Sequence, residues 1–424
     1  MIRAGGGGAL DGLRVVDLTR VLAGPLCTMW LGDMGADVIK IERPGRGDDT
    51  RSWGPPFIGE ESAYFLGVNR NKRSVTLDLA SPAGRDVLRS LVTTADVVVD
   101  NFKIGTLDRW GFTDEWYDEH APQVVRATVS GYGSSGPKAG LPGYDFILQA
   151  ETGLMSITGE TDGRATKVGV AIVDICTGML STIAVLGAVH ARERTGRGQR
   201  VETSLHDTGL QMLANVGANH LASGAEADRF GNGHPNIVPY RTFATSDGDL
   251  AVSVGNDDQF VRFVEILEHP DWATDERFAR NRDRVEHREI IDGLIESVMI
   301  GRDRAEWTAL LESAGIPSGP INSVSEALAA EQARAREMVI EVEHPAIGAI
   351  SMLGIPFQMF GTPATIRRAP PTLGQHSREV LGDELGLEPH HFDRLLRDGV
   401  VTVAGSVRTT DTTDTDEPTN TEDP

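Results

Sequence analysis

Short apolar runs of strand length alternate with stretches of helical periodicity over the first 200 residues. Apolar runs bounded by turn residues are typical of strands buried on both faces, and strands separated by helices form parallel sheets. The predicted strands are residues 14–18, 37–42, 74–78, 97–100 and 124–130, and the predicted helices are 26–34, 82–93 and 144–152. We therefore expect an α/β protein whose large, doubly wound, Rossmann-like domain covers residues 1–200.

The pattern changes after residue 200. A strand near Val201 and a linker helix within 201–224 precede a smaller α+β domain over 225–325, which contains a hairpin around Asp247-Gly248. We expect residues 326–403, with strand-like pieces, a proline-rich crossing and a helix from Ser377, to return and complete the large domain. Residues 404–424 are rich in Thr, Asp and Glu, which predicts a disordered acidic tail.

One carboxylate interrupts a strongly apolar part of the chain. Residues 167–174 are predicted to form a buried strand that ends at Asp174, and an apolar helix is predicted over 179–190. The N–H groups and the dipole at the start of that helix would favour an ionised carboxylate beside them. Asp174 is therefore either a helix cap or a nucleophile, and the spacing alone leaves both roles open.

The amino-acid composition limits which binding partners and which cellular compartment fit the protein. The 40% hydrophobic content fits a large soluble core, and the formal net charge of −22 argues against a nucleic-acid partner. No apolar run approaches the roughly 20 residues of a membrane span, and the first residues lack the apolar core of a signal peptide. Cys27 and Cys176 are far apart and without metal-ligand spacing. We expect a cytoplasmic protein with no membrane or nucleic-acid partner.

Polar residues follow several of the predicted strands, namely Arg20, Arg43, Asn101 and Arg109. Ligands bind at the carboxyl ends of parallel strands, and arginines there can hold phosphate groups, although each could also be an ordinary surface residue. The first strand is not followed by G-x-G-x-x-G, which argues against a dehydrogenase. No metal-ligand motif and no G-x-S-x-G elbow occur. The residues alone predict an α/β protein that binds an anionic ligand and no metal.

Short motifs in a fixed order carry a more specific resemblance. They are Leu13-Arg-Val-Val-Asp-Leu-Thr-Arg-Val-Leu-Ala-Gly-Pro25, Gly35-Ala-Asp-Val-Ile-Lys-Ile-Glu-Arg43, Asn71-Lys-Arg-Ser74, Asp100-Asn-Phe102, Leu107-Asp-Arg109, Gly131-Tyr-Gly133, Thr195-Gly-Arg-Gly-Gln199, His234-Pro-Asn236 and Leu373-Gly-Gln-His376. Together they resemble the class III (CaiB/BaiF-type) CoA-transferase family, to which formyl-CoA transferase and carnitine CoA-transferase belong. The resemblance covers nearly all of residues 11–385.

The resemblance implies a homodimer of two interlocked, ring-like chains that moves CoA from an acyl-CoA to a free carboxylic acid. Asp174 matches the catalytic aspartate, which would form a mixed anhydride and then an aspartyl-CoA thioester. CoA and acyl-CoA are substrates in such a reaction, and no tightly bound cofactor is expected. The candidate CoA-binding residues are Arg20, Leu22, Ala23, Arg43, Leu77, Asn101, Phe102, Lys103, Arg109 and Tyr144. A glycine loop with Gly231, Gly233, His234 and Pro235 would shield the substrate.

Two departures and two alternatives accompany this interpretation. Leu22 stands where formyl-CoA transferases carry a glutamine, which favours an acyl group bulkier than formyl, and Ala80 replaces a basic residue of those enzymes. An α-methylacyl-CoA racemase shares the implied fold, but its Gly-His-Asp run is matched here by Gly143-Tyr-Asp145, and tyrosine is a poor base at neutral pH. A catalytically silent CoA-binding protein, with Asp174 only a helix cap, is the other alternative.

Overall fold

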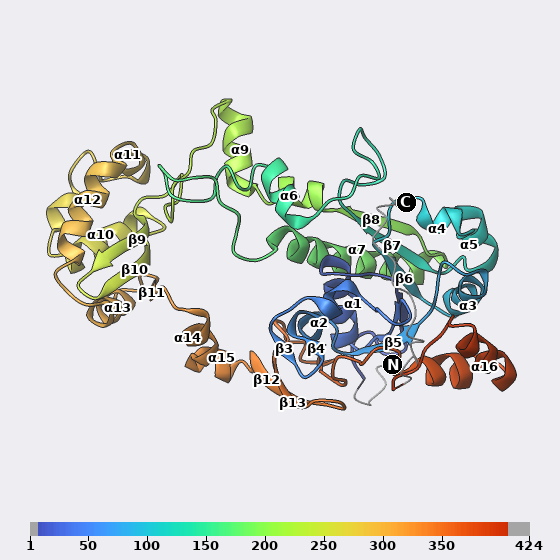
Figure 1. Cartoon of the computed structure of the whole chain (residues 1–424). Helices are drawn as coiled ribbons and strands as arrows, with labels where there is room; N and C mark the ends of the chain where they lie inside the picture. The colour runs from blue at the N-terminus through green and yellow to red at the C-terminus, as the bar shows by residue number, and fades with distance from the viewer. Residues whose placement is uncertain (1–6, 406–424) are drawn as a thin grey trace, which may run out of the picture.

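A six-stranded parallel sheet forms the centre of the molecule, and the expected α/β class is confirmed (Figure 1). The computed structural model describes residues 7–405, so the tail predicted from residue 404 lies almost wholly outside the described residues. The strand order is β5-β2-β1-β6-β7-β8. Their bounds are β1 Arg14–Asp17, β2 Asp37–Glu42, β5 Lys72–Thr76, β6 Val97–Asp100, β7 Val125–Ser130 and β8 Arg200–Ser204.

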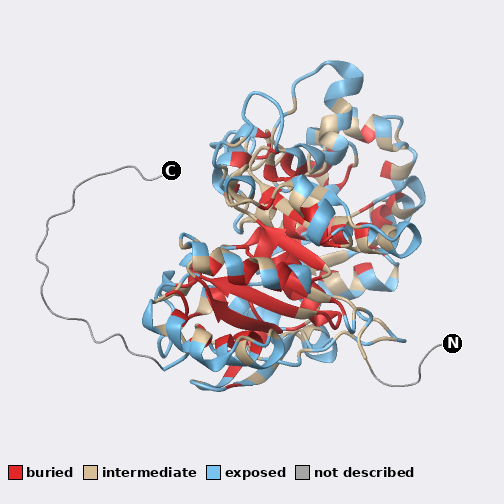
Figure 2. Ribbon diagram, turned by 90° about the vertical axis from the view of Figure 1, so that its right-hand side faces the viewer, coloured by how far each residue is buried: buried red, intermediate tan, exposed pale blue. Residues whose placement is uncertain are grey.

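Helices cover both faces of this sheet, because its central strands are apolar on both sides. Val16, Ile39 and Val98 face a core that includes α3 (Pro82–Thr93), α5 (Asp114–His120) and α16 (Pro389–Arg397). Val15 and Val38 face the opposite core, built with α1 (Ala23–Asp33) and α7 (Ile172–Thr195). Figure 2 shows the buried residues, in red, concentrated in the sheet. Burial on both faces is typical of parallel sheets.

The segment around Asp174 differs from the prediction. Residues 167–171 form no strand, and α7 begins at Ile172, so Asp174 lies in the first turn of a helix. With its 24 residues α7 is also long and apolar enough to cross a membrane by length and composition, so the expectation that no apolar run reaches that length was wrong. One side of α7, with Val185 and Ala188, packs on α1 and on strands β7 and β8, and Met179, Leu180 and Ile183 on α7 are exposed in the single chain. An apolar helix inside a soluble core passes the same test.

The predicted linker helix is two helices, α8 (Leu205–Gln211) and α9 (Ala214–Ser223), separated where Ala214 takes a positive φ of 44°. Beyond them lies a separate small unit with a three-stranded antiparallel sheet and its own core (Figure 1). The predicted hairpin around Asp247-Gly248 is confirmed. The elements of this unit are β9 Tyr240–Thr245, β10 Gly248–Ser253, β11 Ser318–Pro320, α10 Asp257–Ile266, η2 Pro270–Ala273, α11 Asn281–Glu286, α12 Arg288–Met299 and α13 Arg304–Ser313.

The chain then returns to the large unit through α14 (Val324–Ala329), α15 (Glu331–Ala335) and the hairpin of β12 (Val339–His344) and β13 (Gly348–Leu353). The returning residues cover the outer strand of the sheet. Asn71 N–H donates to Arg368 O at 3.0 Å, and His376 N–H donates to Ser74 O at 2.9 Å. The remaining elements are η1 Asp49–Ser52, β3 Phe57–Ile58, β4 Glu61–Ser62, α2 Ala63–Val68, α4 Thr106–Arg109, α6 Asp145–Glu151 and η3 Glu379–Glu384.

Candidate active site

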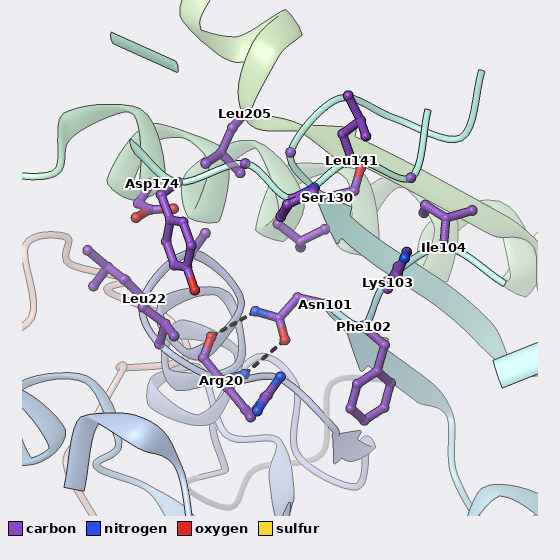
Figure 3. Close-up of a pocket in the computed structure, with 18 of the residues that line it drawn as sticks. Arg20, Leu22, Asn101, Phe102, Lys103, Ile104, Ser130, Leu141, Asp174 and Leu205 are labelled. Carbon is purple, nitrogen blue, oxygen red and sulfur yellow. Dashed lines mark hydrogen bonds between the residues drawn. The ribbon is translucent and has the colours of Figure 1, made fainter. Parts of the chain in front are cut away.

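A pocket of about 480 Å³ opens at the carboxyl ends of β1 and β6 (Figure 3). The chain winds outward from β1 toward β5 on one side and from β6 toward β8 on the other, so this is the point where the strand order reverses. Ligands of doubly wound sheets bind at such a point. The two loops that meet here are joined by Asn101, whose side chain accepts from Arg20 N–H at 3.0 Å and donates to Arg20 O at 2.7 Å.

The carboxylate of Asp174 lines this pocket and has no hydrogen-bond or ion-pair partner among residues 7–405 (Figure 3). The N-terminus of α7 is capped from another element, because Asp145 Oδ1 accepts from Val173 N–H at 2.8 Å and from Asp174 N–H at 3.3 Å. Gln149 in turn donates to Asp145 Oδ2 at 2.6 Å. The helix-cap alternative for Asp174 is therefore wrong, since Asp145 performs that task.

Burial and the negative charge of Asp145 raise the pKa of Asp174 to about 7. The helix start was expected to favour the ionised form of Asp174, which would lower its pKa. Burial and the charge of Asp145 outweigh that effect. Two of the N–H groups that create the helix dipole are already bound to Asp145, and that carboxylate repels a second negative charge. A carboxylate that ionises near neutral pH and lacks hydrogen bonds keeps its lone pairs available for attack on carbon.

Most of the candidate CoA-binding residues lie around the same pocket as Asp174. Arg20, Leu22, Ala23, Asn101, Phe102, Lys103 and Tyr144 line it. Three do not. Leu77 is 1% exposed within the core, Arg43 is exposed after β2, and Arg109 on α4 donates to Thr106 Oγ1 at 3.0 Å. Leu77 therefore offers almost no surface to a ligand, and its N–H is bound to Glu42 O at 2.9 Å.

The glycine loop lies apart from Asp174 within one chain. Gly231, Gly233 and Pro235 line a different pocket, of about 320 Å³, together with residues of α9. Arg288 donates to His234 O at 2.9 Å and to Pro235 O at 3.0 Å, which ties the loop to the small unit. The structure of the single chain therefore does not bring this loop to the nucleophile.

Several pocket residues were missed by the sequence analysis. Asp49 pairs with Arg20 at 3.3 Å, and Leu141 and Leu205 form apolar parts of the wall. Gly131 and Gly143 pass so closely that a Cβ on Gly131 would lie 2.7 Å from Gly143 Cα. Both glycines stand in motifs already named, Gly131-Tyr-Gly133 and Gly143-Tyr-Asp145, and they were the sequence signal for this close approach of two backbones. The sequence carried no signal for the capping role of Asp145, because the helix that it caps begins at Ile172, far along the chain. Within residues 7–405, no group of three or more metal-ligating side chains lies together.

Comparisons with known proteins agree with this site. Residues 10–377 match the family model described as CoA-transferase family III. The chain is 40% identical over 392 residues to the mouse succinyl-CoA:glutarate CoA-transferase, covering 92% of this chain and 90% of that protein. It is 42% identical over 380 residues to the succinate–glutarate CoA-transferase of Agrobacterium fabrum, covering 88% and 95%. A crystal structure of a CAIB/BAIF family protein from Brucella suis, 41% identical, superposes with a TM-score of 0.77 over 89% of this chain and 99% of that chain.

The fold and site, taken with these relatives, define an enzyme that transfers CoA from an acyl-CoA to a carboxylic acid. The chain belongs to CoA-transferase family III, so the resemblance found in its sequence motifs is confirmed.

Proposed function

We propose that Asp174 is the nucleophile of this transfer and that the enzyme works through covalent aspartyl intermediates. The observation that carries the proposal is an unpaired, half-buried carboxylate facing the pocket at the switch point of the sheet. The seven candidate CoA-binding residues around the same pocket support it. Arg43 and Arg109, which are exposed, would act at the outer part of a bound CoA.

The first half-reaction transfers the acyl group to the enzyme. An oxygen of Asp174 attacks the thioester carbonyl carbon, the C–S bond breaks, and CoA leaves as the thiolate with an aspartyl mixed anhydride behind it. The thiolate then attacks the aspartyl carbonyl carbon and expels the donor acid, which gives an aspartyl-CoA thioester. Covalent capture retains the energy of the thioester and divides one difficult exchange into easier steps.

The second half-reaction reverses this order with the acceptor. The acceptor carboxylate attacks the aspartyl carbonyl carbon and releases CoA thiolate, and the thiolate attacks the acceptor carbonyl carbon to give acceptor-CoA and free Asp174. Ala23, in the first turn of α1, lines the pocket, and its N–H group has no partner among the described residues, so we assign this N–H to the developing oxyanion. The N–H groups of Val173 and Asp174 cannot serve, because they bind Asp145.

We propose a dicarboxylic acid as the acceptor. The named reactions of the relatives pair succinyl-CoA with glutarate and with mesaconate, and acetyl-CoA with oxalate. A second carboxylate needs a cation, and the pocket offers Arg20 and Lys103. The apolar Leu22 and Leu205 would contact the carbon chain between the two carboxylates. The matched test compares the rate of CoA transfer to glutarate with that to pentanoate, which has the same chain length but one carboxylate, and glutarate should be the better acceptor.

We also propose that the enzyme is an interlocked homodimer. α7 and α9 carry large apolar side chains that face solvent in the single chain, namely Met179, Leu180, Ile183 and Leu221, the last of these 87% exposed. Contiguous exposed apolar surface is typical of an interface. Within one chain the glycine loop is held by the small unit and lines a different pocket from that of Asp174, so a second chain would have to supply the shielding expected of this loop. Mass measurement in solution tests the dimer.

Hydroxylamine trapping tests the mechanism. Incubation with succinyl-CoA or another true donor, then hydroxylamine, should convert Asp174 to a hydroxamate that peptide mass spectrometry locates. Asp174→Asn should bind CoA but yield no adduct and no transfer. Absence of an adduct with every acyl-CoA in a broad panel, while transfer proceeds, would rule out the covalent route. Solvent deuterium entering the α-carbon without CoA exchange would instead support the racemase alternative.

A further inference from the structure

The loop from Thr19 to Leu22 forms the wall of the pocket beside Asp174, and its backbone conformation is unusual. Arg20, Val21 and Leu22 line the pocket. Val21 has a φ of 72°, in the left-handed region that β-branched residues rarely adopt. A conformation of this kind persists only where the surrounding structure holds it in place, and such positions gather at functional sites.

Buried side chains hold this loop by its backbone. Asp48 Oδ1 accepts from Val21 N–H at 3.2 Å, and Lys40 Nζ donates to Thr19 O at 2.8 Å. Lys40 Nζ and Asp48 Oδ2 form an ion pair at 2.9 Å, and both side chains are fully buried. Asn101 binds both backbone groups of Arg20 from the opposite side. Side chains therefore bind the backbone of Thr19, Arg20 and Val21, while Leu22 O accepts from Leu26 N–H at 2.9 Å at the start of α1.

Asp48 is the residue where these contacts meet. Its backbone N–H donates to Glu42 Oε2 at 3.0 Å, and its carboxylate also accepts from Thr50 N–H at 3.0 Å and Thr50 Oγ1 at 2.8 Å. Burial by itself would raise the pKa of Asp48, but the charge of Lys40 and the hydrogen bonds from Lys40 and Thr50 lower it to about 2. Asp48 is therefore ionised across the neutral range, and it points its charge at the loop rather than at a substrate.

We propose that Asp48 is a positioning residue for the transfer reaction, which acts through Val21 N–H and Lys40 to hold the Arg20–Leu22 wall against the acyl group that faces Asp174. The inference rests on the proposed nucleophilic role of Asp174. This role explains why Lys40 and Asp48 are buried beside the strained loop. An apolar pair would fill the same space but could not hydrogen-bond the backbone of Thr19 and Val21. Displacement of the wall shifts the acyl carbonyl relative to the nucleophile, and errors of about 1 Å in such placements reduce rates by about 100-fold.

The chain offers a matched control for breaking a buried ion pair. Asp33, at the far end of α1, pairs with Arg70 at 2.7 Å, and both side chains are buried. Neither residue lines the pocket. Asp33→Asn and Asp48→Asn therefore remove one buried charge each from the same domain, and only the second disturbs the loop. Asp48→Ala also removes the acceptor for Val21 N–H, which Asp48→Asn retains.

The experiment measures single-turnover acylation of Asp174 by acyl-CoA, KM for acyl-CoA, and hydrogen exchange of the peptide covering residues 18–23. Asp48→Ala should slow acylation about 10- to 100-fold with KM within about 3-fold of the wild type and should increase loop exchange. Asp48→Asn should recover at least part of the rate. Asp33→Asn should change neither rate nor loop exchange, although it lowers stability. If Asp48→Ala does not fold, the test compares the acylation rate and loop exchange of Asp48→Asn with those of Asp33→Asn, and only Asp48→Asn should differ from the wild type.

Three results would overturn the proposal. They are equal losses in the Asp33 and Asp48 variants, unchanged loop exchange in Asp48→Ala, and a change confined to KM. Failure of the proposed function is distinguishable, because the wild type would then form no Asp174 adduct. In that case hydrogen exchange with and without CoA still decides whether Asp48 holds the loop, and unchanged exchange in the Asp48 variants refutes it.

Discussion

Replacement of Asp174 by asparagine should stabilise the fold while it abolishes activity. The wild-type side chain is a half-buried carboxylate without a partner, and asparagine keeps its shape but carries no charge. The pKa of Asp174 is raised from its ordinary 3.8 to about 7, first by burial and then by the charge of Asp145. The folded protein therefore bears a cost at neutral pH that the variant does not.

The size of that cost follows from the pKa. A difference of about three pK units corresponds to about 4 kcal/mol, and solvent that reaches the half-buried side chain reduces this to about 3 kcal/mol. Between pH 3.8 and about 7 the folded state holds the proton and the unfolded state has released it, so wild-type stability falls as pH rises. The advantage of Asp174→Asn should be near zero below pH 4 and reach about 3 kcal/mol above pH 7.

Thermal unfolding of both proteins at pH 5 and pH 8 measures this effect. The difference in Tm should favour Asp174→Asn and widen by a few degrees from pH 5 to pH 8, since about 2 kcal/mol of the cost develops in that interval. Asp258→Asn is the matched control, because Asp258 is exposed in the first turn of α10. Its Tm difference should be small and should not widen. If the Tm difference between Asp174→Asn and the wild type stays constant with pH, or if the variant is less stable at pH 8, the Asp174 carboxylate does not carry this cost in the folded state.

Three further predictions concern the same pocket. Because Asp174 must ionise to attack, kcat/KM for acyl-CoA should rise with pH through about 7, and Asp145→Asn should move that midpoint to lower pH; a pH–rate profile with an unchanged midpoint would contradict the coupling. Val21→Gly should change the free energy of unfolding by less than about 1 kcal/mol in denaturant melts, because relief of the strained φ of 72° offsets the lost packing of a partly buried valine. A loss of about 3 kcal/mol would show that no strain is relieved. Gly131→Ala should cost about 1–3 kcal/mol and raise KM for acyl-CoA, because the new Cβ meets Gly143 at 2.7 Å; an unchanged melt and KM would show that the loop gives way freely.

Much of the sheet and its binding edge could be predicted from local pattern. Apolar runs such as residues 97–100 are short and flanked by turn residues, which is the signature of a buried parallel strand, and β6 forms there. Ligands bind at the carboxyl ends of parallel strands, and Arg20 and Asn101 follow two of the predicted strands. These two residues hydrogen-bond to each other at the pocket.

The errors arose where distant residues decide local structure. Residues 167–174 have the composition of a buried strand, but no strand pairs with them, and Asp145 caps a helix start at Ile172 instead. A cap supplied from another helix leaves no signal in the neighbouring sequence. The buried Lys40 was equally hidden, because lysine is among the residues least often found inside, and only its contacts with Asp48 and Thr19 show why it is there.

The return of the chain over β5 has a consequence for synthesis on the ribosome. All six strands of the sheet are made by residue 204, but the residues that hydrogen-bond the outer strand, Arg368 and His376, emerge near the end of translation. Until then the nascent large unit presents an unpaired strand edge, which is a template for aggregation. Fragments that stop before residue 365 should therefore precipitate on expression, and the full-length protein should depend on chaperones during synthesis more than its final fold suggests.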